Sequence, residues 1–152
     1  MKTLHLNLKR KWFDMILSGE KKEEYRDITD YWFRRFKNTQ CRCFFKVTLS
    51  IAYRHYKETN RIIPFKGLFD SMELRYKTVT FSNGYAKNRD QFEIELKSMP
   101  VHIGKEELGA EPGELYFVLK LGEIIKHNSL LNNSKEGIWR YQKRKETSFL
   151  RQ

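Results

Sequence analysis

The feature that most constrains the fold is a set of short segments in which apolar and polar residues alternate. A period of two places every second side chain on one face of a strand, so each segment predicts a half-buried β-strand. A chain of 152 residues has room for one domain of ordinary size. We therefore expect a single α+β domain that is mainly β, with strands in these segments: Leu4 to Leu8, Val47 to Tyr53, Val79 to Phe81, Phe92 to Leu96 and Leu115 to Leu121.

A short helix is expected between the first two strands. From Lys11 to Ser18 the spacing of the apolar residues changes, because Phe13, Ile16 and Leu17 fall on one helical stripe. Gly19 follows at the position where a helix end favours a left-handed residue. The sequence therefore predicts that this helix ends at Gly19.

The rest of the chain is expected to add strands, one more helix and several turns. A strand from Lys22 to Arg26 precedes a helix that Asp30 caps and whose apolar stripe includes Tyr31 or Trp32, and Phe36. Between Thr39 and Lys77 we expect the strand at 47–53 and an irregular connection. Turns and loops are indicated by three signals: Asn83-Gly84, Pro100 and the stretch from Gly109 to Gly113.

Charge and cysteine content narrow the class of protein. Thirty Lys and Arg against nineteen Asp and Glu give a formal net charge of +11, which favours polyanions such as nucleic acid as partners. The last 27 residues, 126–152, hold seven basic and two acidic residues, so their net charge is +5.

Cys41 and Cys43 are one residue apart and cannot link distant elements. Without a signal peptide pattern or a membrane-spanning apolar stretch, we expect a cytoplasmic protein that does not enter a membrane.

The segment from Gly19 to Arg26 concentrates residue types that can bind anions. In a strand, Glu24 and Arg26 project to the same face, where the carboxylate can orient the guanidinium for a phosphate or a base edge. Lys21, just after the turn at Gly19, can add an ammonium as a point charge. The plainer alternative is an exposed ladder of ion pairs. For Tyr25, on the other face, we expect a place in the core.

This segment resembles the ASCH family, whose motif GxKxxExR is matched by Gly19, Lys21, Glu24 and Arg26. The preceding strand and short helix and the aromatic-rich helix that follows are similar to the family's pattern. The resemblance implies a small PUA-like β-barrel with flanking short helices, in a domain over residues 1–125. Residues 39–75 are then an insertion, and residues 126–152 are a basic C-terminal extension.

Four further residues are candidates for contacts with a ligand. Trp12 and Tyr85 either pack or stack on a base. Ser82 and Asn83 either offer neutral hydrogen bonds to a base or serve the turn at Asn83-Gly84. We expect no cofactor and no metal site, because the cysteines lack a second pair and the histidines are far apart: His5, His55, His102 and His127.

Three functions stay open at this point. The first is binding of RNA, another nucleic acid or a nucleoside-like small molecule at Lys21, Glu24 and Arg26. The second is a small hydrolase, because the resemblance includes amidohydrolases that act on acetylated cytidine and relatives proposed to cut RNA; Lys21 and Glu24 would then be catalytic. In the amidohydrolases a threonine stands at the position of Glu24. The third is a protein-interaction module that uses aromatic residues of the insertion and the extension.

Overall fold

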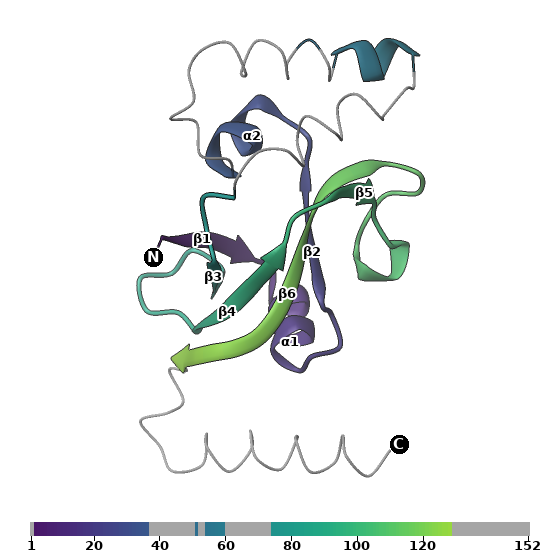
Figure 1. The fold of residues 1–152 in the computed structure, drawn as a ribbon. Helices are drawn as coiled ribbons and strands as arrows, with labels where there is room; N and C mark the ends of the chain where they lie inside the picture. Colours follow the sequence, from purple (N-terminus) through teal and green to yellow (C-terminus); the bar gives the residue numbers. More distant parts are fainter. Residues whose placement is uncertain (1, 37–50, 52–53, 60–73, 129–152) are drawn as a thin grey trace. The chain divides into compact units, whose positions relative to one another are not determined.

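The computed structural model describes residues 2–36, 51, 54–59 and 74–128. These residues confirm an α+β fold that is mainly β, with few and short helices (Figure 1). The chain forms two compact units. Unit 1 contains residues 1–2, 23–77 and 96–121, and unit 2 contains residues 3–22, 78–95 and 122–152. Two strands, β4 (Gln91–Ser98) and β6 (Leu115–Asn128), contribute residues to both units.

The elements follow one another in the order expected for most of the chain. They are β1 (Thr3–Leu8), α1 (Arg10–Leu17), β2 (Glu23–Asp27), α2 (Asp30–Phe36), β3 (Thr78–Asn83), β4 (Gln91–Ser98), β5 (Val101–Ile103), the 3-10 helix η1 (Glu106–Leu108) and β6 (Leu115–Asn128). The short strand β5 and η1 were not expected. β6 continues past residue 125, where the basic extension was expected to begin, and residues 129–152 lie outside the described part.

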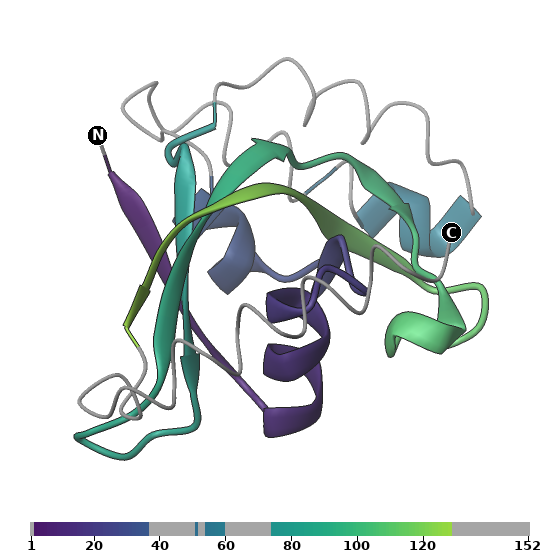
Figure 2. The ribbon, with the colours of Figure 1, turned by 90° about the horizontal axis from the view of Figure 1, so that it is seen from below.

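Unit 2 is built on three strands that lie side by side (Figure 2). β1 pairs with β3 in parallel, with Leu6 opposite Phe81, and β3 pairs with β4 antiparallel, with Phe81 opposite Phe92. The alternation of Leu4, Leu6 and Leu8 places all three in the core, as the sequence predicted. α1 adds Phe13, whose ring meets that of Phe92 edge-on at 4.8 Å between centroids.

Unit 1 is built on β2, β5 and β6. β2 pairs antiparallel with β6, with Tyr25 opposite Val118, and β5 pairs with the start of β6. Tyr25 is buried against Tyr116, Val118 and Ala110, which confirms its expected place in the core. α2 contributes Phe36, which is fully buried and meets Phe117 edge-on.

Two local predictions were wrong. Ile51 and residues 54–59 are helical, where the sequence predicted a strand and an irregular connection; the rest of that strand, 47–50 and 52–53, lies outside the described residues. Ile51 is largely exposed, so its apolar side chain does not mark a buried strand face. At the start of α2 the cap is Thr29, one residue before Asp30, since the Thr29 hydroxyl accepts a hydrogen bond from the Trp32 N–H at 3.4 Å.

Candidate functional site

The turn after α1 positions Lys21. Gly19 has a φ of 82°, the left-handed conformation that glycine adopts without a steric penalty, and so ends the helix as predicted. The Lys21 N–H then donates to the carbonyl of Met15 at 2.9 Å, which fastens the start of the next segment to α1. The Lys21 side chain is buried, with 3% of its surface exposed.

Trp12 of α1 covers this lysine. The Lys21 Nζ lies 4.2 Å from the centroid of the indole ring, and the Lys11 Nζ lies 4.5 Å from it. Both distances are within the range of cation–π attraction. Trp12 is half-buried, and its indole ring offers an aromatic face to both ammonium groups.

On β2, the motif carboxylate and guanidinium form the pair that their spacing predicted. Arg26 Nη1 donates to Glu24 Oε1, and also to the carbonyl of Tyr25 at 2.6 Å. The side chains of Glu24 and Arg26 are only 7% and 14% exposed. An exposed ion-pair ladder is therefore excluded for this pair, and two acceptors fix the plane of the guanidinium.

A second aromatic ring, Trp32 of α2, lies against this pair. The Arg26 Cζ is 5.3 Å from the centroid of the Trp32 ring, and the Arg35 Cζ is 5.5 Å from it. The sequence prediction included Trp32 only as one choice for the apolar stripe. The sequence did hold a signal for the contact between Trp32 and Arg35. The two residues are three apart, and residues with that spacing are neighbours on one face of a helix.

The candidates around Asn83 differ in their surroundings. Ser82 is buried, and its hydroxyl accepts a hydrogen bond from the Gln91 side-chain amide at 2.9 Å, so it joins β3 to β4. Asn83 ends β3, and its N–H donates to the carbonyl of Asp90. Tyr85 is 86% exposed, so of its two expected roles packing is excluded, and its ring is accessible to a ligand.

Within each unit the structure thus joins part of the motif to an aromatic side chain. In unit 2 it brings Lys21 to Trp12, and in unit 1 it brings Glu24 and Arg26 to Trp32. Lys21 and Glu24 are three residues apart along the chain. In the part of the chain that the structure describes, the buried polar or charged residues are Lys21, Glu24, Thr78 and Ser82. Both charged members of that set belong to the motif.

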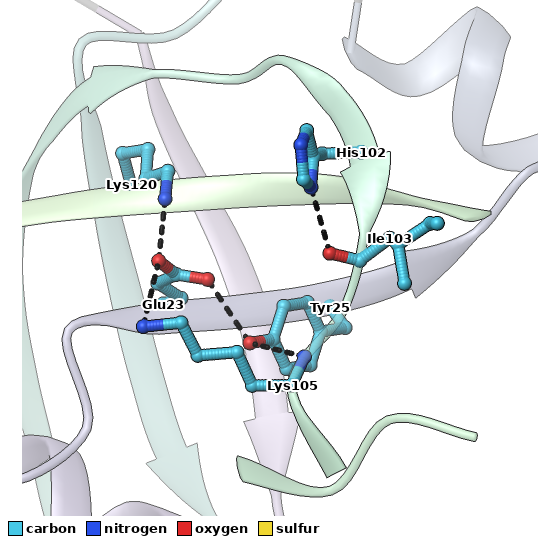
Figure 3. A network of polar contacts seen from close by, with 6 residues as sticks. All are labelled: Glu23, Tyr25, His102, Ile103, Lys105 and Lys120. Carbon is cyan, nitrogen blue, oxygen red and sulfur yellow. Dashed lines mark hydrogen bonds and ion pairs between the residues drawn. The ribbon is translucent and has the colours of Figure 1, made fainter. Parts of the chain in front are cut away.

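The opposite face of β2 carries a separate polar network (Figure 3). Glu23 accepts hydrogen bonds from Lys120 and from the Tyr25 hydroxyl, and the Lys105 N–H donates to that hydroxyl at 3.2 Å. Burial raises the pKa of Glu23, but the hydrogen bonds and the positive charges of Lys120 and Lys105 outweigh it and lower the pKa. Burial also raises the pKa of Tyr25 to about 12. The network binds the segment before η1 to β2, which is a structural role.

A cavity of about 340 Å³ in unit 1 has the wrong charge for an anion. Its lining contains three carboxylates, Asp27, Glu111 and Glu114, against one ammonium, Lys57. The Lys57 Nζ lies 4.0 Å from Glu114 Oε2, so part of its charge is already compensated. A phosphate group would be repelled there, so this cavity is not a candidate site for anionic ligands.

The residues that the structure describes, 2–36, 51, 54–59 and 74–128, contain neither a metal-binding cluster nor a membrane-spanning helix. No group of three or more His, Cys, Asp and Glu side chains among those residues could hold a metal ion, and Cys41 and Cys43 lie outside them. No helix in the same ranges is both long and apolar enough to cross a membrane.

Comparisons of the chain with models of protein families, with curated proteins and with solved structures found no match.

Proposed function

We propose that this protein binds RNA or a nucleotide-like ligand through Lys21, Glu24 and Arg26. The observation that carries the proposal is the burial of charge in the motif: Lys21 and Glu24 are 3% and 5% exposed. Lysine and glutamate are almost never buried to this extent in proteins unless they are paired, so the motif holds both side chains in a specific arrangement. A PUA-like ASCH domain and a cytoplasmic location are part of the same proposal.

The chemistry of Arg26 fits an anionic or base-like ligand. Its two hydrogen bonds described above are both made by Nη1, and a guanidinium carries further N–H donors on Nη2 and Nε. These donors form a planar fork that matches two phosphate oxygens or the edge of a base. Because Glu24 and the Tyr25 carbonyl hold the plane of the group, little conformational entropy is lost when a ligand binds.

The charge of the whole chain supports a polyanionic ligand. A formal charge of +11 raises the rate at which nucleic acid meets the protein and adds phosphate contacts that weaken with salt. Trp12 and Trp32, each next to a motif cation, offer aromatic faces of the kind on which bases stack. Motif, charge and aromatic rings thus favour the same class of ligand.

The test is fluorescence-polarisation binding of labelled RNA and DNA across a salt series, with free nucleosides and nucleotides as competitors. Arg26→Ala removes the fork, Arg26→Lys keeps the charge without it, and Arg10→Ala removes a charge from an exposed arginine as the matched control. Circular dichroism verifies that each variant is folded. Part of the binding of labelled nucleic acid should be displaced by free nucleotides. We expect both Arg26 variants to lose this part, while Arg10→Ala keeps it.

Two results would contradict the proposal. One is that the wild-type protein binds neither single-stranded nor structured RNA, DNA or nucleotides at low salt. The other is that Arg26→Lys and Arg26→Ala bind as the wild type does at every salt concentration. Product analysis of the same samples covers the hydrolase alternative, for which substrate turnover must appear in the wild type and disappear in Lys21→Ala.

A further inference from the structure

We propose that α2 carries a stacking platform for an unpaired base of single-stranded nucleic acid. The platform consists of Tyr31, Trp32 and Arg35, and Arg26 of β2 borders it. The proposal rests on the proposed function, because Arg26 belongs to the motif. It adds that the ligand is a single strand whose base lies on α2, next to a phosphate held by the arginines.

The aromatic part of the platform combines an exposed ring, Tyr31, with an indole, Trp32, that a buried ring supports from one side. Trp32 stacks on Phe36, with 5.2 Å between ring centroids and 19° between the planes, and Phe36 is fully buried. Tyr31 meets Trp32 edge-on at 4.9 Å and is 59% exposed. An exposed aromatic ring is costly to hydrate, and a base stacked on Tyr31 would remove that ring and the exposed part of Trp32 from water.

Two guanidinium groups lie at the same indole. Arg26 and Arg35 place their Cζ atoms 5.3 and 5.5 Å from the Trp32 centroid. Arg35 Nη1 also donates to the Tyr31 hydroxyl at 2.5 Å, and this interaction sets the orientation of the Arg35 side chain. The result is a surface that alternates planar cations with aromatic rings, the combination found where single strands bind.

The geometry distinguishes a single strand from other anions. In a duplex both faces of each internal base are covered by neighbouring bases, so a protein ring cannot stack on them without unpairing. The carboxylates of an acidic peptide could pair with the arginines. Such a peptide does not carry a planar ring on each residue, as a nucleic acid does, and so supplies no regular partner for stacking at Trp32. The platform therefore fits a chain of alternating phosphates and exposed bases.

The experiment compares three labelled ligands of equal length: a single-stranded RNA, the same backbone with abasic nucleotides, and a duplex RNA. Tyr31→Ala and Trp32→Leu remove ring surface, and Tyr31→Phe keeps the ring but loses the hydrogen bond to Arg35. Arg35→Gln is compared with Arg34→Gln, because Arg34 is an exposed arginine of the same turn. Thermal denaturation verifies folding, and Tyr31→Ala serves if Trp32→Leu does not fold.

We expect each ring removal to weaken single-strand binding by about 5- to 150-fold, the range for loss of one base stack. Binding of the abasic strand and the duplex should change less than twofold. Arg34→Gln should bind as the wild type does, and Arg35→Gln should weaken binding of the single strand more than Arg34→Gln. Tyr31→Phe should weaken it less than Tyr31→Ala does, because the ring remains and only the hydrogen bond to Arg35 is lost.

Three outcomes overturn the inference, and they separate it from the proposed function. If Tyr31→Ala and Trp32→Leu bind the single strand normally while Arg26→Ala does not, the motif site stands and the platform is wrong. If the ring variants lose the abasic strand equally, the effect is not stacking. If the wild-type protein binds no nucleic acid or nucleotide, or binds only acidic peptides, both proposals fail.

Discussion

Replacement of Tyr25 by phenylalanine tests the polar network of Figure 3 at a single atom. The Tyr25 hydroxyl donates to Glu23 Oε2 at 3.0 Å and accepts from the Lys105 N–H at 3.2 Å. Each hydrogen bond contributes about 0.5–1.5 kcal/mol net to stability, so loss of both lowers the free energy of unfolding by about 1–3 kcal/mol. We expect this loss near neutral pH, with the ring still packed against Tyr116.

The same hydroxyl makes the difference between wild type and variant depend on pH. Burial raises the pKa of Tyr25 to about 12, aided by Glu23 and opposed by the Lys105 N–H, against about 10 in an unfolded chain. Between these values the folded state keeps a proton that the unfolded state has lost, so stability falls as the pH rises. At about pH 11 the decrease is about 1.4 kcal/mol, and solvent screening reduces it to about 1 kcal/mol.

Urea unfolding followed by tryptophan fluorescence measures both quantities. The free energy of unfolding is determined at about pH 8 and about pH 11 for the wild type, for Tyr25→Phe and for Tyr85→Phe, which changes an exposed tyrosine. Effects of pH that do not involve the substituted hydroxyl cancel in the differences between the three proteins. The reasoning is refuted if the gap between the wild type and Tyr25→Phe is the same at both pH values, or if Tyr85→Phe shows the same pH-dependent gap.

Three further substitutions probe other parts of the structure, each measured by urea or thermal unfolding. Glu24→Ala leaves the guanidinium of Arg26 without its buried carboxylate and should cost about 3–5 kcal/mol; a cost below about 1 kcal/mol would mean that the pair is exposed in solution. Phe81→Ala empties a fully buried site between two strands and should cost about 3–5 kcal/mol. Thr29→Ala removes the cap of α2 and should cost about 0.5–2 kcal/mol, whereas Thr29→Ser should restore most of it because serine can still accept from the Trp32 N–H.

Five of the six strands that the structure describes, all but β5, and the helix α1 could be predicted because their signals are local. Alternation at Leu4 to Leu8 and at Phe92 to Leu96 reports which face of a strand is buried, and Gly19 reports the end of a helix. The parallel pairing of β1 with β3 could not be predicted in this way, since alternation contains no information about the partner strand. Alternation also failed at Ile51, where no burial supports it.

The candidate site was predictable to a similar degree. A spacing of two residues on a strand was sufficient to pair Glu24 with Arg26. The burial of Lys21 depends on where Trp12 lies after α1 has formed, which is a tertiary property. Trp32 was missed as a site residue because its role arises from a cation on another element, Arg26 of β2.

The parallel pairing of β1 with β3 has a consequence for how the protein is made and how fast it folds. Thr3 is aligned with Thr78, so β1 leaves the ribosome about 75 residues before its neighbour and has to wait unpaired. Pairs so distant in sequence raise the contact order, and proteins with high contact order fold slowly. The cost of closing such a loop grows only as the logarithm of its length, about 0.6 kcal/mol for each doubling. A longer segment between α2 and β3 would therefore delay completion of the sheet on the ribosome, while it would destabilise the finished protein only slightly.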